Sequence, residues 1–595
     1  MTGEVAGGVA GGVAGGVAAA GLTVPALLER SARLHPDNDS FVFADARQTY
    51  AELERSALDV ARSLTALGIG RGDAVGALMP NCLDFVHAML GTAMVGALFV
   101  PLNARLAPRE LRYLIPDSGM KLIVTTDAVD EHVDYAGRLC EALPGLARTG
   151  TGTGTGAGTG TGSDTGTGSG AEPGGAPRLA EAPALRHAVV LGRRTVAGFL
   201  SGEQFRALGA PVDAASARAA ATAVPPDAPY IMMYTSGTTS VPKGCPLSHA
   251  SVVRLGRAVG EEAFRVRPED RMWNPLPMFH VSAQAQMIGV LNAAAAYISM
   301  THFEPTEALE LIERERATLL FPAYPTLTGP LLNHPDYHPD TFARVRGLLT
   351  VGPPELLRRY QELLPHTAHV SCYGSTETGG VAVMGRLDDP LEQRLTCGKP
   401  FDGVEVEVRD PATGGPIPTD VVGELYVRGY SLFLGYHNDP AKTAENIDAE
   451  GWFHTGDLGR IDGHGNLTFT GRLKDMLKVG GENVGCAEVE VYLLSHPDVV
   501  VAAVVGIPDP TYDEVPAAFL QLRPGAALSG DDVVAFCRTG LAKYKVPRFV
   551  RFVTDWPMSA TKIQKFRLRD RLLAELPDRR DHDEPVRLGG GPRED

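Results

Sequence analysis

Short apolar runs alternate with amphipathic patterns along most of the chain, and this alternation is typical of an α/β protein. Thr49 and Glu52 have the spacing of a capping box, and apolar residues recur behind them at helical intervals as far as Leu64. Pro25 suits the first turn of an earlier helix. Further patterns predict strands at residues 74–79, 121–125, 231–234, 319–321 and 347–351, and helices at residues 24–30 and about 82–95.

The pattern changes to shorter strands and turns between about residues 410 and 475, which predicts a β-rich subdomain. The remainder of the chain, as far as residue 576, mixes helix and strand patterns. Helices are expected at residues 488–494 and 531–541, and strands at 499–505 and 549–553. We therefore expect a large N-terminal domain, residues 21–473, built from α/β subdomains and the β-rich subdomain. A small mobile C-terminal α+β domain, residues 474–576, should follow it.

Three segments have too few large apolar side chains to form a core. Residues 1–20 repeat Val-Ala-Gly-Gly and are interpreted as a disordered leader. Residues 148–177 form a Thr/Gly-rich tract, which we expect to be a flexible surface insertion in the N-terminal domain. Residues 577–595 are charged and glycine-rich, as in a frayed tail.

Composition narrows the classes of function. With 595 residues, 44% of them hydrophobic, the chain has the make-up of a globular protein of several domains. Its formal net charge of −16 disfavours nucleic acid as a partner, since phosphates would be repelled. No apolar run is long enough to predict a membrane span. The seven cysteines are scattered without short paired spacings, so a reducing cytoplasm is the expected location.

The stretch from Tyr234 to Gly244 carries the first candidate chemistry. It follows the apolar run 231–234 and precedes residues 247–253, whose pattern predicts a helix start, so strand, loop and helix are expected in that order. Backbone amides of such a loop can approach an anion, and hydroxyl and ammonium groups add donors. The predicted phosphate-binding residues are Thr235, Ser236, Gly237, Thr238, Thr239 and Lys243. No Ser or Thr follows Lys243, so this is not a Walker loop, and a plain linker is the alternative.

The whole string Tyr-Thr-Ser-Gly-Thr-Thr-x-x-Pro-Lys-Gly resembles the phosphate-binding signature of the adenylate-forming superfamily, which includes acyl-CoA synthetases. One position departs from it, because the family usually has Gly where this chain has Ser240. A second string, Tyr-Gly-Ser-Thr-Glu, resembles the next motif of that family. The resemblance implies that Tyr373 lies against adenine, Thr376 meets the α-phosphate and Glu377 ligates Mg²⁺.

Two later strings resemble further motifs of the same family. In the string ending Thr-Gly-Asp, the resemblance implies that Asp457 binds both ribose hydroxyls. In residues 471–483, Arg472 would contact ribose or phosphate, and Lys474-Asp475 would be a hinge. The string also contains Lys478, assigned to cofactor binding, and Gly480-Gly481, which would let the pantetheine arm of CoA pass close to the backbone.

The resemblance also assigns catalytic residues. Lys562, in a string that ends Lys-Ile-Gln-Lys, matches the family lysine that catalyses adenylation, although the loop before it lacks a glycine. Thr238 of the phosphate loop is assigned with it to the adenylation step. His280 follows Pro-Leu-Pro-Met-Phe and is the candidate gate of the acyl pocket.

These motifs occur in family order and imply an ATP-dependent carboxylate–CoA ligase. The acid would be activated as acyl-AMP with release of pyrophosphate, and its acyl group would then pass to the thiol of CoA. ATP, Mg²⁺, CoA and a small carboxylic acid are the expected ligands. Two alternatives stay open: an enzyme that loads the phosphopantetheine of a carrier protein, and a binding paralogue with impaired catalysis.

Overall fold

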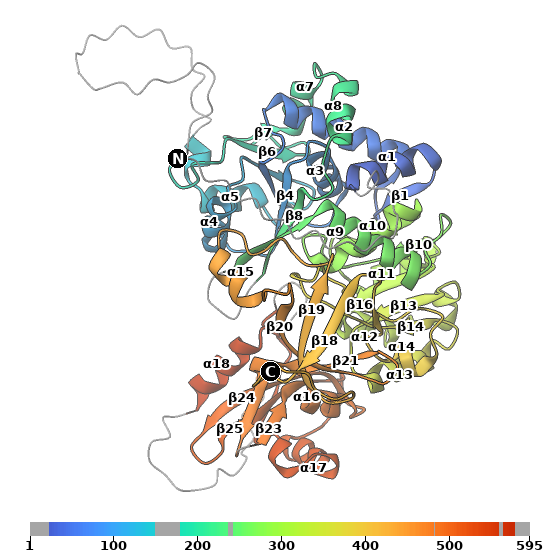
Figure 1. Cartoon of the computed structure of the whole chain (residues 1–595), viewed down its shortest axis with the longest axis vertical. Helices are drawn as coiled ribbons and strands as arrows, with labels where there is room; N and C mark the ends of the chain where they lie inside the picture. Colours follow the sequence, from blue (N-terminus) through green and yellow to red (C-terminus); the bar gives the residue numbers. More distant parts are fainter. Residues whose placement is uncertain (1–22, 149–178, 236–241, 481, 559–562, 577–595) are drawn as a thin grey trace, which may run out of the picture.

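The computed structural model describes residues 23–148, 179–235, 242–480, 482–558 and 563–576 (Figure 1). The predicted leader, nearly all of the Thr/Gly-rich insertion and the predicted tail lie outside these residues. In the described part, one seven-stranded sheet is parallel apart from its last pair. Its order is β7 (Leu200–Ser201), β6 (His187–Leu191), β5 (Leu122–Thr126), β3 (Ala74–Leu78), β4 (Leu98–Leu102), β8 (Pro229–Thr235) and β9 (Lys243–Ser248).

A second seven-stranded sheet in the described residues repeats this plan, with one antiparallel strand at its edge. Its order is β14 (Ala368–Val370), β13 (Gly347–Thr350), β12 (Leu319–Ala323), β10 (Arg271–Trp273), β11 (Ala296–Ile298), β1 (Asp39–Val42) and β2 (Arg47–Thr49). One continuous hydrophobic core includes Phe99 of the first sheet and Tyr297 of the second, together with Tyr50, which directly follows β2. The two sheets therefore share one core.

Helices pack between and around the two sheets (Figure 1). Helices α9 (His249–Arg257) and α10 (Val281–Ala293) approach each other unusually closely. A Cβ atom added at Gly256 would lie 2.5 Å from Ile288, and one added at Gly289 would lie 2.8 Å from the Gly256 carbonyl. The helices of this region are α1 (Val24–Leu34), α2 (Tyr50–Ala66), α3 (Leu83–Met94), α4 (Pro108–Asp117), α5 (Tyr135–Ala142), α6 (Gly145–Arg148), α7 (Gly202–Gly209), α8 (Ala214–Thr222), α9 (His249–Arg257), η1 (Ala258–Ala263), α10 (Val281–Ala293), α11 (Pro305–Arg314), α12 (Pro325–Leu332), η2 (Pro339–Phe342) and α13 (Pro354–Leu363).

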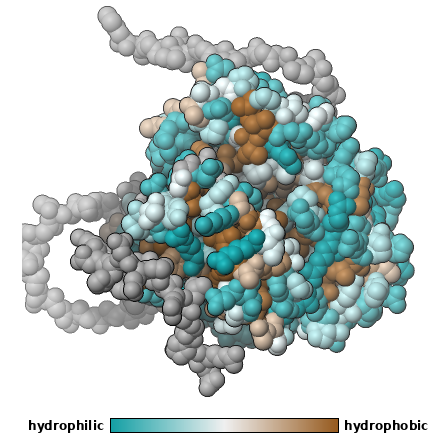
Figure 2. Space-filling model, turned by 90° about the horizontal axis from the view of Figure 1, so that it is seen from below, coloured by the Kyte–Doolittle hydropathy of each residue, from teal (hydrophilic) through white to brown (hydrophobic). Residues whose placement is uncertain are grey.

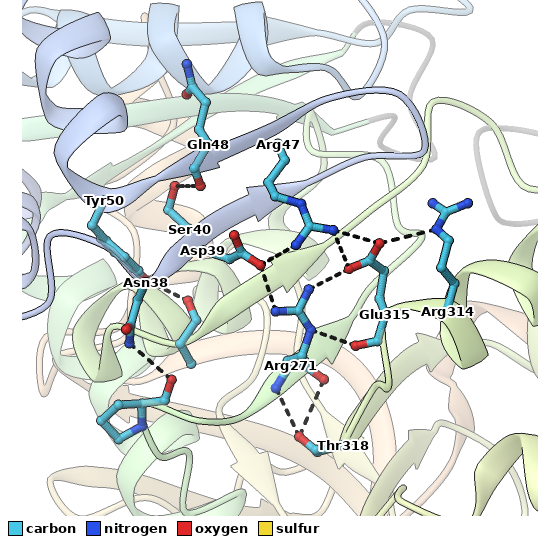
Figure 3. A network of polar contacts seen from close by, with 12 residues as sticks. Asn38, Asp39, Ser40, Arg47, Gln48, Tyr50, Arg271, Arg314, Glu315 and Thr318 are labelled. Atoms are coloured by element: carbon cyan, nitrogen blue, oxygen red, sulfur yellow. Dashed lines mark hydrogen bonds and ion pairs between the residues drawn. The ribbon is translucent and has the colours of Figure 1, made fainter.

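An ion-pair network, here called the sheet cluster (Asp39, Arg47, Arg271 and Glu315), ties the second sheet together at the amino ends of its strands (Figure 3). The guanidinium of Arg271 lies 2.8 Å from an Asp39 oxygen and 2.6 Å from Glu315 Oε2. The Arg47 guanidinium reaches the same two carboxylates at 2.6 and 2.8 Å. Glu315 is only 6% exposed, so its charge depends on these partners.

A β-rich region follows. Four antiparallel strands form its main sheet: β18 (Val404–Arg409), β19 (Gly423–Gly429), β20 (Phe453–Ile461) and β21 (Leu467–Arg472). A small sheet of β15 (Cys372–Tyr373), β16 (Val383–Met384) and β17 (Lys399–Pro400) precedes it, with α14 (Leu391–Arg394) before β17 and α15 (Pro440–Asn446) between β19 and β20. Ser371 separates β14 from β15, so the two neighbouring strands belong to different sheets.

The C-terminal part forms a mixed sheet with helices on both faces, at the lower end of Figure 1. Helices α16 and α17 share one core with this sheet, and α18 packs on the other side through Leu568 and Leu572. Seen from this end, the surface is largely hydrophilic with scattered hydrophobic patches (Figure 2). The elements are η3 (Leu473–Asp475), β22 (Met476–Val479), β23 (Glu482–Gly485), α16 (Cys486–Leu494), β24 (Val499–Asp509), β25 (Asp513–Leu522), α17 (Gly530–Gly540), η4 (Lys543–Lys545), β26 (Phe549–Phe552) and α18 (Lys565–Glu575).

The predicted fold class is confirmed: a large N-terminal α/β part with a β-rich portion precedes a small α+β part. The capping box of Thr49 and Glu52 is present, and Pro25 lies in the first turn of α1. Among the described residues, no helix is both long and apolar enough to cross a membrane.

Candidate active site

The glycine-rich loop is flanked by two paired strands. Thr235 ends β8 and Lys243 begins β9, and these two residues are opposite each other in the antiparallel ladder. The predicted order of strand, loop and helix is therefore wrong, because residues 243–248 pair with β8 and bury Cys245 and Leu247 before α9 begins. The predicted phosphate-binding residues Ser236, Gly237, Thr238 and Thr239 lie outside the described residues.

Tyr436 lies between Lys243 and Glu377. The Lys243 ammonium is 5.2 Å from the centre of the Tyr436 ring. The Tyr436 hydroxyl donates a hydrogen bond to Glu377 Oε1 over 3.1 Å. Burial, followed by the charge of Glu377, raises the pKa of Tyr436, so the phenol stays protonated and keeps donating. The structure thus brings the predicted lysine and the predicted metal ligand to one aromatic side chain.

The segment that carries Tyr436 is held by backbone hydrogen bonds to both neighbours. The Phe433 amide donates to the Glu377 carbonyl over 2.9 Å, and the His437 amide donates to the Gly244 carbonyl over 2.8 Å. Tyr436 was missed in the sequence because it lies 59 positions from Glu377 in a turn with no recognised motif. An aromatic residue directly after Gly435, between β19 and α15, was the available signal.

Tyr373, Asp457 and Arg472 meet in a second group, here called the junction cluster. The Tyr373 hydroxyl donates to Asp457 Oδ2 over 2.9 Å, and Arg472 Nε lies 3.1 Å from Asp457 Oδ1. Asp457 and Arg472 are opposite each other on β20 and β21, whereas Tyr373 comes from β15. The structure therefore places three sequence-predicted nucleotide-binding residues in direct contact.

Burial controls the chemistry of the junction cluster. Tyr373 and Asp457 are 6% and 5% exposed, while the Arg472 side chain is 44% exposed. Burial, and then the Asp457 carboxylate, raise the pKa of Tyr373 well above its usual value, so the phenol remains a donor. The Tyr373 ring stacks on Phe469 with centroids 5.9 Å apart. A carboxylate is a group that also accepts hydrogen bonds from hydroxyl groups of a ligand.

His280 lies at the start of α10, where it is the N-cap residue, and its ring centre is 5.0 Å from that of Phe279. The loop that follows Glu377 reaches this helix, since a Cβ atom at Gly380 would lie 2.9 Å from the Val281 carbonyl. Thr376 is half-buried in the same loop, and its carbonyl accepts the Gly379 amide over 3.2 Å. The candidate gate and the candidate metal ligand therefore belong to adjoining segments.

The predicted CoA-binding residues lie on the β22–β23 hairpin. Gly480 has a φ of +60°, which disfavours residues with a Cβ, and its amide donates to the Tyr512 carbonyl over 2.8 Å. Lys478 is exposed on β22. Gly481 and Lys562 lie outside the described residues, as do all of residues 559–562. Met558 and Ile563, on either side of that gap, form an antiparallel bridge.

The small C-terminal part contacts the N-terminal part next to the junction cluster. A Cβ atom at Gly471, directly before Arg472, would lie 3.8 Å from Ala487 of α16. Residues 473–475, which contain the predicted hinge, form the short helix η3 between β21 and β22. A rotation there would change which face of the small domain meets the cluster.

A Mg²⁺ ion held largely by a nucleotide fits this set of residues. Glu377 offers a carboxylate whose Oε1 accepts a hydrogen bond from Tyr436, and carboxylates accept more than one partner. Within the described ranges, no three His, Cys, Asp or Glu side chains gather as a metal cage. Mg²⁺ commonly binds through one or two carboxylates together with substrate phosphates, so a single protein carboxylate is sufficient.

Comparisons with known proteins agree with this geometry. A family model described as AMP-binding enzyme matches residues 28–437, and one described as AMP-binding enzyme C-terminal domain matches residues 488–562. A methyl-dioxo-octahydro-indenyl-propanoyl:CoA ligase of Mycobacterium tuberculosis is 36% identical over 92% of this chain and 98% of its own length. A medium-chain acyl-CoA ligase of Mus musculus, named as mitochondrial, is 30% identical over 93% of this chain and 88% of its own.

Solved structures of similar fold also include CoA ligases. The anthranilate CoA ligase AuaEII in complex with anthranoyl-AMP has a TM-score of 0.77 and 25% identity, covering 93% of this chain and 98% of that one. ATP-bound MatB from Rhodopseudomonas palustris has a TM-score of 0.73 and 26% identity, covering 92% and 98%. The motifs, the fold and these relatives lead to one conclusion: the chain belongs to the AMP-binding enzyme family, in its acyl-CoA ligase branch.

Proposed function

We propose that this AMP-forming carboxylate–CoA ligase binds the nucleoside part of ATP at the junction cluster. Asp457 accepts hydrogen bonds from the ribose hydroxyls, Arg472 contacts ribose or phosphate, and Tyr373 lies against the adenine. The contact among these three side chains is the observation that carries the proposal. Arg472 pairs with Asp457 through Nε and its side chain is 44% exposed, so in the proposal the guanidinium contacts a phosphate while it keeps this pair.

The phosphates lie, in this proposal, between the flanks of the glycine-rich loop and the loop of Glu377. Thr235 and Lys243 are the described ends of the first loop, and Thr376 contacts the α-phosphate from the second. Mg²⁺ bound at Glu377 supplies positive charge that stabilises the phosphoryl oxygens. Tyr436 holds the Glu377 side chain by its 3.1 Å hydrogen bond, which keeps the carboxylate oriented.

The reaction then needs positioning more than a protein nucleophile. The substrate carboxylate attacks the α-phosphorus of ATP, the bond to the β-phosphate breaks, and pyrophosphate leaves. The CoA thiol then loses its proton and attacks the acyl carbon, and AMP leaves. In the proposal Lys562 and Thr238 serve the first step, and the small domain, residues 474–576, rotates about Lys474-Asp475 before the second.

The acid and the acceptor thiol have their own predicted contacts. His280 gates the acyl pocket, and buried Met278 and Met287 on either side favour an apolar acyl or aryl group. Gly480 and Gly481 are the proposed passage for the pantetheine arm, and Lys478 contributes to cofactor binding. The phosphopantetheine of a carrier protein is the alternative acceptor, since it presents the same thiol.

A panel of aliphatic and aromatic acids tests the proposal with the full chain. Acid-dependent release of pyrophosphate, followed by thioester formation with free CoA, is the expected result. Parallel reactions with a phosphopantetheinylated carrier protein decide between the two acceptors. If none of the acids in the panel causes release of pyrophosphate, that result would contradict the proposal and favour a binding paralogue with impaired catalysis.

A cytoplasmic location is part of the proposal. All seven cysteines lie in the described residues and are free thiols, as expected for a reducing compartment. Fractionation of the producing cells with an antibody to the chain tests the location.

Cys245, beside the phosphate loop, is a poor nucleophile. Burial raises the pKa of its thiol, and the Glu377 charge adds to the effect.

A further inference from the structure

The loop between β10 and α10 has no regular structure, yet it leads directly to His280. Its backbone is held by one buried side chain from a distant part of the chain. Asn81 Nδ2 donates to the Leu276 carbonyl over 2.9 Å, and the Met278 amide donates to Asn81 Oδ1 over 2.7 Å. Asn81 is only 3% exposed. A single amide group therefore bonds the loop at two points, as a neighbouring strand would.

Asn81 also connects the two large sheets at the carboxyl ends of their strands. It follows β3 in the first sheet, while Asn274 and Ser299 directly follow β10 and β11 in the second. Asn81 Nδ2 lies 3.3 Å from Ser299 Oγ, and that hydroxyl donates to the Asn274 carbonyl over 2.9 Å. Ligands of open α/β sheets bind at the carboxyl ends of strands, so this link lies on the substrate side.

The other hydrogen bonds at residues 276 and 278 are local. Asn274 Oδ1 accepts the Leu276 amide over 2.9 Å, and Gln284 Nε2 donates to the Met278 carbonyl over 3.0 Å. With these bonds the carbonyl and amide groups of residues 276 and 278 are satisfied by side chains. The second sheet ties the loop at its start, where the Asn274 amide donates to the Ile298 carbonyl over 2.9 Å. At residues 276 and 278, the long-range hydrogen bonds of the backbone come from Asn81.

We propose that Asn81 is a positioning residue for the acid substrate: it fixes Met278 and the following His280, and so sets the shape of the acid-binding wall. The inference rests on the proposed function, in which His280 gates the acyl pocket. Asn81 itself touches no substrate. Loss of its two bonds should loosen the wall, which weakens acid binding and reduces discrimination between acids, while the nucleotide site is unchanged.

The test compares Asn81→Ala, Asn81→Asp and a control, Asn38→Ala, in the full-length enzyme. Asn38 also makes long-range side-chain bonds to backbone, with Nδ2 3.0 Å from the Ala294 carbonyl, but at the far end of α10. Aspartate has the same size as asparagine and keeps an acceptor for the Met278 amide. Asn81→Asp is therefore expected to fold even if Asn81→Ala does not. The Michaelis constants for acid and ATP are measured by pyrophosphate release.

Asn81→Ala should raise KM for the best acid about tenfold, and Asn81→Asp should raise it by a smaller factor because the aspartate keeps the Met278 bond. Both variants should leave KM for ATP within about twofold and narrow the spread of kcat/KM across the acid panel. Asn38→Ala should leave both constants unchanged. Equal rises of the two constants, or an unchanged KM for acid in a folded Asn81 variant, would overturn the proposal.

Hydrogen exchange separates this inference from the proposed function. The amide of Met278 should exchange about tenfold faster in Asn81→Ala than in the wild type and in Asn38→Ala, because its acceptor is removed. If the wild type uses no acid, the proposed function fails and the assignment of Asn81 to an acid-binding wall fails with it. If the wild type is active and the exchange rate is unchanged, only the assignment of Asn81 fails.

Discussion

The sheet cluster and the junction cluster use the same chemical groups for different ends. In the sheet cluster, Arg47 and Arg271, which begin strands of one sheet, both bond Asp39 and Glu315, and Arg314 also bonds Glu315. In the junction cluster, one carboxylate is bonded by a tyrosine from a different sheet and by an arginine that is nearly half exposed. Pairing within one rigid sheet favours stability, whereas pairing between separate elements leaves groups able to exchange partners.

The largest expected effect is on stability, at the sheet cluster. Glu315→Ala removes a buried acceptor shared by Arg47 and Arg271, and should lower the free energy of unfolding by about 3 kcal/mol. Denaturant unfolding measures it. The exposed pair of Arg358 and Glu392 is the control, and Glu392→Ala should cause no measurable change. Pyrophosphate release per folded molecule should be normal in both variants, and a selective loss of activity in Glu315→Ala would erase the contrast.

The next effect is on activity, at the junction cluster. Asp457→Ala removes the proposed acceptor of the ribose hydroxyls and should lower kcat/KM for ATP about 100-fold, equivalent to ~2.7 kcal/mol. Steady-state pyrophosphate release measures it. Stability should fall less than in Glu315→Ala. Normal kinetics with strongly reduced stability would show that both clusters serve the fold.

Acid pH should lower the stability of the whole chain through a buried histidine that belongs to neither cluster. Burial lowers the pKa of His249 to about 3, against 6.5 as its ordinary value. Below pH 6.5 the unfolded chain therefore binds more protons, so stability falls as pH drops from 7 to 5, by about 2 kcal/mol for this group. His249→Phe should remove that part of the slope, whereas Glu315→Ala and Asp457→Ala should retain it. Unfolding at both pH values measures the slopes, and an unchanged slope in His249→Phe would refute this origin.

The smallest expected effect comes from one hydrogen bond. Tyr373→Phe keeps the ring that stacks on Phe469 but loses the donor to Asp457. Because Arg472 still holds Asp457, KM for ATP should rise only about fivefold, or ~1 kcal/mol, with little change in kcat. Titration of ATP in the pyrophosphate assay measures it. A loss as large as that of Asp457→Ala would mean that Tyr373, rather than Arg472, orients the carboxylate.

The fold was predictable where the local signal and the tertiary structure agree. The capping box at Thr49 and Glu52 and the buried run of β3 are two examples. Prediction failed at residues 243–248. This strand contains Pro246 and pairs with β8 across a loop, so it has no clear local signature. The motif residues Tyr373, Asp457 and Arg472 could be named from the sequence, but their mutual contacts could not.

The missed site residues depend on contacts between distant segments. Tyr436 meets Glu377, and Asn81 meets Met278 at a separation of 197 positions. Side-chain direction in loops is set by such contacts rather than by periodicity, so no pattern along the chain indicates it. The assigned roles of Ser236, Gly237, Thr238, Thr239, Gly481 and Lys562 stay predictions, since these residues lie outside the described part of the chain.

Direct binding of ATP by calorimetry, in the wild type, Asp457→Ala and Glu315→Ala, tests the central claim that the junction cluster holds the nucleotide. Glu315→Ala, studied where it is folded, should bind ATP as the wild type does, and Asp457→Ala should bind it about 100-fold more weakly. Equal affinity of Asp457→Ala and the wild type would contradict the account.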